Sequence, residues 1–356
     1  MARVLVLGGT SYVAQFVLQR VLQDDALRVM NGEASEEISA VACTIRSEPF
    51  SPLPTGFVTL GSDSAARAVR VYWQVDILDL NALEICIKDF RPTVVINCTA
   101  ISSPAICQKD PDKASSINEP RGLVTLLETL PWRVRFVHLS TDFVYEGGLA
   151  WGESYEEDAA VLSSKLSVYG ASKLRFDQFL LEREHSASLE VLVLRIANVI
   201  GPVAPLFQDR SAPKFMQWLH RQLFQPEDAD APLKLWSDEF RSYLYIHDLV
   251  SVMFNLLAVK NNTPATLINL GGVEAFSRVE LARQYLAACA KHDARTVTTV
   301  TREIVPIARA QIDLGYPSPL NTKLSTARLA HLLQDFQWTP TDQVLDEISR
   351  SLHMKS

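Results

Sequence analysis

Tyr169 and Lys173 stand four residues apart in the segment Val168-Tyr-Gly-Ala-Ser-Lys173. Apolar residues continue at helical intervals to Leu180, so the spacing predicts a helix in which phenol and amine lie one turn apart. A nearby ammonium favours the phenolate and is expected to lower the pKa of the tyrosine, ordinarily near ~10. Such a pair can act as a general acid or base near neutral pH. Because the spacing alone arises by chance in roughly a quarter of such chains, other segments must support this interpretation.

A glycine-containing turn near the start of the chain indicates a second candidate site. Arg3–Leu7 is a short apolar run, typical of a strand buried in a parallel sheet, and a helical pattern follows from Gln15 to Leu22. Between them lie Gly8, Ser11 and Ala14, where dinucleotide-binding turns carry three spaced glycines. The strand–turn–helix order aims helix N-terminal amides at a pyrophosphate. With this incomplete glycine set, a purely structural turn is an equally good interpretation.

The second predicted strand, Ile38–Ile45, is followed by Arg46, where NAD-binding chains usually carry an acidic residue. An arginine suits the 2′-phosphate of NADP, so the sequence favours NADP(H) over NAD(H), the alternative being an ordinary surface arginine. We expect a loop-rich insertion at Ser47 to Arg70. A third strand, Val71–Val75, then leads to Asp76, which is positioned to contact adenine.

Thr93–Asn97 and Arg135–Leu139 are the fourth and fifth predicted strands. Strands alternating with helical patterns predict an α/β fold, a Rossmann-type doubly wound parallel sheet that binds ligands at the carboxyl ends of its strands. Candidate residues converge at or after such ends: Gly8, Arg46, Asp76, Thr99, Thr141 and Tyr169.

Composition and charge narrow the functional classes. The 356 residues are 47% hydrophobic, enough for one large domain or two smaller ones, and a dispersed net charge of −7 argues against nucleic-acid or membrane partners. The five cysteines have neither metal-ligand nor disulfide spacing, so we expect buried free thiols and no metal site. The chain enters a strand at once, and no apolar run reaches the roughly 18 residues of a membrane helix. We therefore expect a cytoplasmic protein.

Several further motifs follow in a characteristic order: Ser140–Gly147 (Ser-Thr-Asp-Phe-Val-Tyr-Glu-Gly), Leu194–Pro202, Arg241–Leu249 and Ile268–Gly272. With them, the chain resembles the extended short-chain dehydrogenases/reductases over roughly residues 2–350. Within that family it is most similar to the branch containing dTDP-4-dehydrorhamnose reductase and the regulatory β subunit of methionine adenosyltransferase. The related dehydratases carry a glutamate where this chain has Phe143, so dehydration is not expected.

The resemblance implies roles for particular residues. Tyr169 would donate a proton to a carbonyl oxygen, Lys173 would hold the nicotinamide ribose, and Thr141 would hydrogen-bond the same oxygen, with Ser140 a weaker candidate. The implied cofactor-binding residues are Gly8, Thr10, Ser11, Tyr12, Val13, Arg46, Asp76, Ile77, Thr99, Ala100, Tyr169, Lys173 and Ile196. The implied substrate-binding residues are Ser103, Asn198 and Arg241.

The resemblance also implies two units: residues 1–201 plus 241–275 as a NAD(P)-binding Rossmann domain, and 202–240 plus 276–356 as a smaller, discontinuous substrate lobe. The sequence departs from the reductases at Phe176 and Asp177, and Tyr316–Pro319 replaces an expected Arg-Pro. We expect an NADP-dependent reductase of a carbonyl on a sugar nucleotide or related small molecule. The alternatives are a non-catalytic NADP-binding regulatory subunit and, third, a nucleotide-sugar epimerase. A homodimer or a partner enzyme is compatible with either class.

Overall fold

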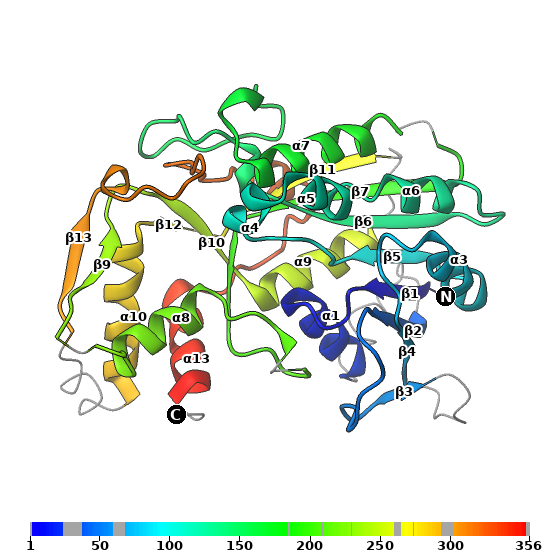
Figure 1. Cartoon of the computed structure of the whole chain (residues 1–356), viewed down its shortest axis with the longest axis horizontal. Coiled ribbons are helices and arrows are strands. Elements are labelled where there is room, and N and C mark those ends of the chain that lie inside the picture. The colour runs from blue at the N-terminus through cyan, green and yellow to red at the C-terminus, as the bar shows by residue number, and fades with distance from the viewer. Residues whose placement is uncertain are drawn as a thin grey trace.

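The computed structural model describes residues 2–23, 38–59, 68–183, 186–207, 210–228, 230–259, 265–272, 274–292 and 302–353. Its centre is a sheet of eight strands that all pair in parallel (Figure 1). In spatial order these are β11 (Ala265–Leu270), β7 (Leu189–Ile196), β6 (Val134–Thr141), β5 (Val94–Asn97), β1 (Ala2–Leu7), β2 (Ile38–Ile45), β4 (Val69–Trp73) and β3 (Phe57–Thr59). Chain order reverses between β1 and β5, which is where ligands bind in sheets of this kind.

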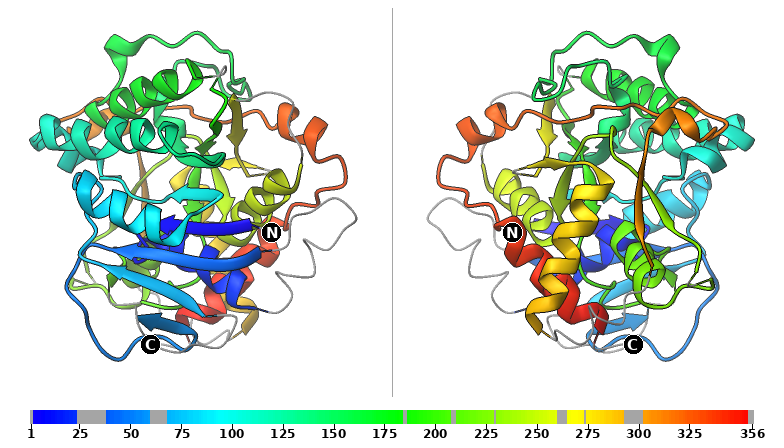
Figure 2. Two further views of the ribbon diagram at one scale, coloured as in Figure 1. Left: turned by 90° about the vertical axis from the view of Figure 1, so that its right-hand side faces the viewer. Right: turned by 90° about the vertical axis from the view of Figure 1, so that its left-hand side faces the viewer.

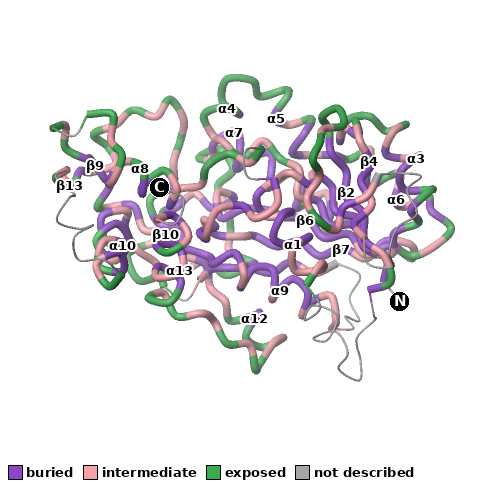
Figure 3. The backbone as a smooth tube through the Cα atoms, turned by 90° about the horizontal axis from the view of Figure 1, so that it is seen from below, coloured by how far each residue is buried: buried purple, intermediate pink, exposed green. Residues whose placement is uncertain are grey.

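The strands are mostly apolar because both faces of the sheet are covered by helices (Figure 2). Along β1, Val4 and Val6 join one core, while Leu5 and Leu7 join another on the opposite face. The first core includes residues of α1 (Tyr12–Leu22) and α9 (Ile246–Ala258); the second includes residues of α3 (Leu80–Phe90), α6 (Arg121–Glu128) and α7 (Val168–Leu181). Figure 3 shows buried residues concentrated in these central strands.

The smaller sheets lie at one end of the molecule (Figure 1). They are a three-stranded sheet of β8 (Asn198–Ile200), β10 (Arg241–Tyr245) and β12 (Ala275–Phe276), and a pair of β9 (Leu233–Trp236) with β13 (Ile304–Ile307). The helices here are α8 (Phe215–Phe224), α10 (Arg278–His292) and α13 (Thr341–His353), while α12 (Ala327–Leu332) contacts β11. Two short helices beside the main sheet, α4 (Pro104–Lys109) and α5 (Pro111–Asn118), contact α7.

The predicted Rossmann-type sheet is confirmed, and β2 covers the predicted residues. The region expected to be a loop-rich insertion contains the short strand β3, which pairs with β4, and its residues 60–67 lie outside the described chain. Among the described helices, none is both long and apolar enough to cross a membrane. The division into two units stays a proposal, because strands of the smaller sheets come from both of the proposed units.

Candidate active site

A cavity of about 510 Å³ lies at the carboxyl ends of β1, β5, β6 and β7. This volume falls within the ~300–1,000 Å³ typical of small-molecule sites. Its walls include most of the residues expected to bind cofactor or substrate or to act in catalysis: Ser11, Tyr12, Val13, Thr99, Ala100, Ser103, Ser140, Thr141, Tyr169, Lys173, Ile196, Asn198 and Arg241. The parallel sheet brings them together because the ends of its strands share one edge.

Tyr169 lies in the first turn of α7, a helix that begins where Ser167 accepts a hydrogen bond from the Gly170 amide. The Tyr169 side chain is buried, and its ring meets the edge of Phe143 at a centroid distance of 5.7 Å. Burial raises the pKa of Tyr169, and an interaction with the Thr141 hydroxyl opposes this shift only in part. The expected lowering of this pKa is therefore wrong, and the phenol keeps its proton at neutral pH.

Lys173 follows one turn later and is 2% exposed. Its Nζ donates a hydrogen bond to the Leu139 carbonyl at 2.9 Å and lies 3.4 Å from Nε2 of His138. Burial lowers the pKa of Lys173 to about 8, although Asp177 on the same helix favours the charged form. The predicted pair thus shares one helix face, but burial decides the pKa of both groups, raising that of the phenol and lowering that of the amine.

Arg241, the first residue of β10, is buried at the far side of the cavity. Its Nε donates to Glu239 at 2.8 Å, Nη1 lies 3.3 Å from Oδ2 of Asp142, and Nη2 donates to the Pro319 carbonyl at 3.1 Å. The guanidinium also lies over the Phe143 ring, 4.5 Å from its centroid. Most of the donors of this arginine therefore serve the protein itself, which limits what it can offer to a substrate.

Asp142 joins the sheet to the last part of the chain. Its Oδ2 accepts a hydrogen bond from the Thr322 hydroxyl at 2.6 Å, and its Oδ1 accepts one from Thr141 at 3.1 Å. Burial raises the pKa of Asp142 despite the neighbouring Arg241 guanidinium. Thr141, the candidate donor to a substrate oxygen, is consequently held in place by a carboxyl group that is itself fixed from two sides.

A buried polar network lies behind the cavity wall. Oδ2 of Asp177 accepts hydrogen bonds from Ser140 Oγ at 2.8 Å and from Arg195 Nε at 3.0 Å. Nη1 of Arg195 in turn donates to the Tyr145 hydroxyl at 2.8 Å. Burial raises the pKa of Asp177. The Ser140 hydroxyl is thus engaged with Asp177, just as the Thr141 hydroxyl is engaged with Asp142.

Five predicted cofactor residues do not line the cavity: Gly8, Thr10, Arg46, Asp76 and Ile77. Gly8 has a φ of +76°, and a Cβ there would lie 2.8 Å from Cγ2 of Thr99, so the turn needs glycine for its conformation and for close approach to β5. Arg46 is exposed directly after β2. Oδ1 of Asp76 accepts a hydrogen bond from the Leu78 amide at 3.0 Å. These assignments stay predictions.

Sequence reasoning assigned Asn198 and Arg241 of the smaller sheets to the site but missed other cavity residues from the same part of the molecule. Lys214, Trp236, Arg278 and Tyr316 all line the cavity. Nζ of Lys214 lies 5.4 Å from the centre of the Tyr12 ring, and the Arg278 guanidinium lies 3.9 Å from that of Trp236. Two of them had a sequence signal: Arg278 lies in Ser277–Leu281, which continues the series of motifs after Gly272, and Tyr316 begins the segment that replaces the Arg-Pro of the reductases. Lys214 and Trp236 lie in segments without a recognisable pattern.

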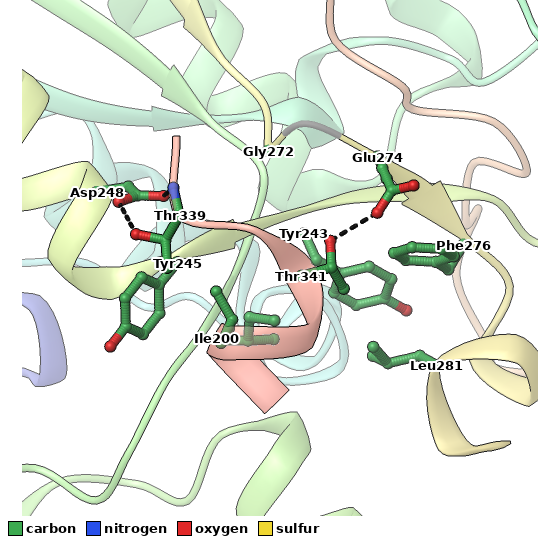
Figure 4. A pocket seen from close by; sticks show the side chains of 11 residues that line it. Ile200, Tyr243, Tyr245, Asp248, Gly272, Glu274, Phe276, Leu281, Thr339 and Thr341 are labelled. Atoms are coloured by element: carbon green, nitrogen blue, oxygen red, sulfur yellow. Dashed lines mark hydrogen bonds between the residues drawn. The ribbon is translucent and has the colours of Figure 1, made fainter. Parts of the chain in front are cut away.

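A second cavity, of about 20 Å³, lies between α9, β10 and the start of α13 (Figure 4). Asp248 accepts hydrogen bonds from the Thr339 amide at 3.0 Å and its hydroxyl at 2.7 Å, and Glu274 accepts one from the Thr341 hydroxyl at 2.7 Å. The cavity has room for about one water molecule, so we interpret it as a small gap in the packing. The hydrogen bonds around it hold the chain in place where α13 begins. In the described part of the chain, no group of three or more metal-binding side chains is placed to hold a metal ion.

Gly170 offers a test of how tightly α7 is packed against the cavity wall. A Cβ at this position would lie 2.1 Å from the Phe143 carbonyl oxygen, a contact that neither backbone can relieve cheaply. We expect Gly170→Ala to lower the free energy of unfolding by roughly 1–3 kcal/mol, measured by urea denaturation. Gly148→Ala is the matched control, since the nearest atom to a Cβ there is 3.9 Å away. Equal midpoints for the two variants would contradict this account of the packing.

The sequence was compared with known proteins. Residues 4–271 match the model of the NAD-dependent epimerase/dehydratase family. The chain is 26% identical over 266 residues to methionine adenosyltransferase 2 subunit beta from Pongo abelii, covering 75% of this chain and 72% of that protein.

Solved structures share the fold across the whole chain. The UDP-glucose 4-epimerase of Thermus thermophilus, in complex with NAD, aligns with a TM-score of 0.68 and 20% identity, covering 99% of each chain. The dTDP-4-dehydrorhamnose reductase of Bacillus anthracis, in complex with NADP, aligns with a TM-score of 0.67 and 15% identity, covering 98% of each chain.

Proposed function

The chain belongs to the NAD-dependent epimerase/dehydratase family, and from this premise we propose that it is an NADP-dependent oxidoreductase that reduces a carbonyl group. The proposed substrate is a sugar nucleotide or a related small molecule. One observation carries the proposal: Thr141, Tyr169 and Lys173 line the same cavity as the N-terminus of α1. A proton donor and a nucleotide-binding helix terminus therefore meet in one space of suitable size.

The residues around the glycine turn fit a dinucleotide. Gly8 adopts a left-handed conformation and packs against Thr99, so the backbone of the turn stays close to the end of β5. The Ser11 side chain accepts a hydrogen bond from the Ala14 amide at 3.3 Å, which turns its hydroxyl towards the helix. Ser11, Tyr12 and Val13 would present the N-terminal end of α1 to the pyrophosphate. When bound, the nicotinamide supplies hydride chemistry.

The protein groups would supply the proton and the orientation. Tyr169 is protonated at neutral pH and would donate this proton to the carbonyl oxygen, although burial raises its pKa and makes the phenol a weaker acid. Thr141 would hydrogen-bond the same oxygen by turning its hydroxyl proton from Asp142 to the substrate. Lys173 would hold the ribose hydroxyls. Phe143 occupies the neighbouring wall with an aromatic ring in place of a carboxylate, so this position offers no base for dehydration.

Arg46 carries the proposed preference for NADP(H). We expect Arg46→Ala to weaken NADPH binding about tenfold or more, because a charge-assisted contact to the 2′-phosphate contributes roughly 1.5–3 kcal/mol. NADH lacks this phosphate, so its affinity in the same variant is the internal control and should stay unchanged. Fluorescence titration of both nucleotides measures the effect. Equal losses for NADPH and NADH, or no loss for either, would remove Arg46 from the cofactor site.

Two alternative functions also have support. A regulatory subunit that binds NADP without turning over a substrate is favoured by the similarity to methionine adenosyltransferase 2 subunit beta and by the internal use of Arg241. An epimerase is favoured by the alignment with UDP-glucose 4-epimerase. Incubation with NADPH and a panel of sugar nucleotides separates the three. Net oxidation of NADPH supports the reductase, interconversion without net oxidation supports the epimerase, and binding without either supports the regulatory subunit.

A further inference from the structure

Arg278 is the first residue of α10, and its side chain lines the cavity of the candidate active site. Its Nε donates a hydrogen bond to Oε1 of the buried Glu239 at 3.3 Å, and the same oxygen accepts one from Nε of Arg241 at 2.8 Å. The side chain of Arg278 is nevertheless 29% exposed, whereas that of Arg241 is 4% exposed. The two arginines thus share one carboxylate but differ in what they can offer to a ligand.

The difference lies in the terminal nitrogens of the two guanidinium groups. Those of Arg241 contact Asp142, Thr322 and Pro319, so each of them is already used within the protein. Those of Arg278 make no hydrogen bond or ion pair with any residue that the structure describes. Arg278 therefore presents a planar pair of NH₂ groups, the arrangement that binds a phosphate through two parallel hydrogen bonds.

Aromatic side chains hold the Arg278 guanidinium in place. Its carbon atom lies 3.9 Å from the centre of the Trp236 ring and 5.2 Å from that of Phe215. Both aromatic residues also line the cavity, and a cation over the face of such a ring is attracted to it. With Nε bound to Glu239 and the guanidinium over Trp236, the side chain has little freedom left to lose, which lowers the entropic cost of binding an anion.

The cavity carries more positive than negative charge. Of the charged side chains among the described residues that line it, four are basic and one, Asp142, is acidic; the basic ones are Lys173, Lys214, Arg241 and Arg278. Asp142 lies 3.3 Å from Arg241, so its charge is directed at that arginine. Such an excess of basic groups favours an anionic ligand.

The contacts around Arg278 connect it to the Tyr169 side of the cavity. Arg241, whose Nε donates to the same carboxylate oxygen, lies over the Phe143 ring at 4.5 Å, and that ring meets the ring of Tyr169 at 5.7 Å. Lys214 instead lies over the ring of the first residue of α1, at the helix end proposed for the cofactor pyrophosphate. An anion bound by Arg278 therefore belongs with the group that reacts at Tyr169.

We propose that Arg278, rather than Arg241, binds a phosphate group of the substrate. The inference rests on the proposed function: the carbonyl compound would carry a phosphate, as a sugar nucleotide does, and Arg278 would hold that phosphate while the carbonyl lies at Tyr169. Arg241, which the sequence assigned to the substrate, instead joins β10 to Asp142 and to the chain at Pro319. The choice between the two arginines follows from which of them keeps its terminal donors free.

Calorimetric titration with inorganic pyrophosphate tests the proposal, because sugar nucleotides carry this group. The protein is first saturated with NADP⁺, so that the positions for the phosphates of the cofactor are filled. We expect Arg278→Gln to weaken pyrophosphate binding about tenfold or more, since it removes charge-assisted hydrogen bonds. Arg309→Gln is the matched control, because Arg309 lies over the same Trp236 ring at 5.3 Å but does not line the cavity. This control should bind pyrophosphate as tightly as the unaltered protein.

Equal losses in Arg278→Gln and Arg309→Gln would show that general positive charge, and not the Arg278 side chain, attracts the anion. Loss of pyrophosphate binding on addition of NADP⁺ would show that the anion occupies the cofactor site. Either result, or no binding of pyrophosphate at all, overturns the proposal. The titration requires no turnover, so a protein that binds pyrophosphate through Arg278 but reduces no carbonyl compound would contradict the proposed function alone.

A measurement on the unaltered protein does not depend on how a variant folds. Phenylglyoxal modifies accessible arginines, and mass spectrometry of the resulting peptides gives the rate at each position. At a pyrophosphate concentration ten times its dissociation constant, we expect the modification of Arg278 to slow about tenfold, while the rate at Arg309 stays the same. Modification of Arg278 at the same rate with and without bound pyrophosphate would overturn the proposal.

Discussion

Replacing Tyr169 by phenylalanine is expected to lower the turnover of a carbonyl substrate roughly 10²–10⁴-fold while NADPH affinity changes little. The substitution removes one hydroxyl and keeps the ring, so the edge contact with Phe143 and the packing of α7 remain. The lost hydroxyl is the proposed proton donor. Absorbance loss of NADPH measures turnover, and fluorescence titration measures binding.

Tyr72→Phe is the matched control for this experiment. Tyr72 is also buried, but its hydroxyl contacts Asp89 on α3 and does not line the cavity. Its removal should leave turnover unchanged. The reductase proposal would be contradicted if the unaltered protein and Tyr169→Phe were equally inert in a broad screen of sugar nucleotides and simple carbonyl compounds. Retained NADPH binding in that result would support the regulatory alternative.

Arg195→Met is expected to lower the free energy of unfolding by roughly 3–5 kcal/mol at pH 7, measured by urea denaturation. Arg195 and Asp177 are both buried, and the substitution leaves the carboxylate without its cation. Oδ1 of Asp177 has no hydrogen-bond partner among the described residues, so the protein offers little compensation. Methionine keeps most of the volume, which separates the charge effect from a cavity effect.

The pH dependence of this variant identifies the cause. Burial raises the pKa of Asp177 in the folded protein, so this group binds protons more tightly folded than unfolded and its contribution to stability improves as pH falls. Loss of Arg195 raises that pKa further, and the difference between variant and unaltered protein should therefore shrink from pH 7 to pH 5. Adding Asp177→Asn should recover much of the loss. A deficit that neither acid nor Asp177→Asn reduces would show that packing, not charge, is responsible.

Much of the sheet was predictable because the sequence patterns that define its strands are local. Short apolar runs bounded by turns predicted β1, β2, β5 and β6, and helical spacing predicted α7 together with the shared face of Tyr169 and Lys173. The order of these elements along the chain was enough to place Thr99, Thr141 and Tyr169 at one cavity, since parallel strands end at the same edge.

The electrostatics of the site were not predictable from spacing. The distance from Tyr169 to Lys173 along the chain predicted a lowered pKa for the phenol, but burial is the largest effect on this group and raises its pKa. Solvent exclusion depends on side chains contributed by the whole fold, which no local pattern contains. Two of the groups that contact the Arg241 guanidinium, Asp142 and Pro319, likewise lie 99 and 78 residues away from it along the chain.

The hydrogen bond between Asp142 and Thr322 spans 180 residues, and it has a consequence for the order in which the protein is made. A ribosome releases the N-terminal strands first, so most of the parallel sheet can assemble while the residues near Thr322 are still awaiting synthesis. Until those residues are synthesised, Asp142 lacks its hydrogen bond from Thr322, and Arg241 lacks its hydrogen bonds to Thr322 and Pro319. Contacts over such separations also form slowly, because the closure of a long loop precedes any gain from the contact. The strands of the central sheet are thus expected to exist as a partly folded chain before the residues on the far side of the cavity are in place, and that interval is when the nascent protein is most exposed to aggregation.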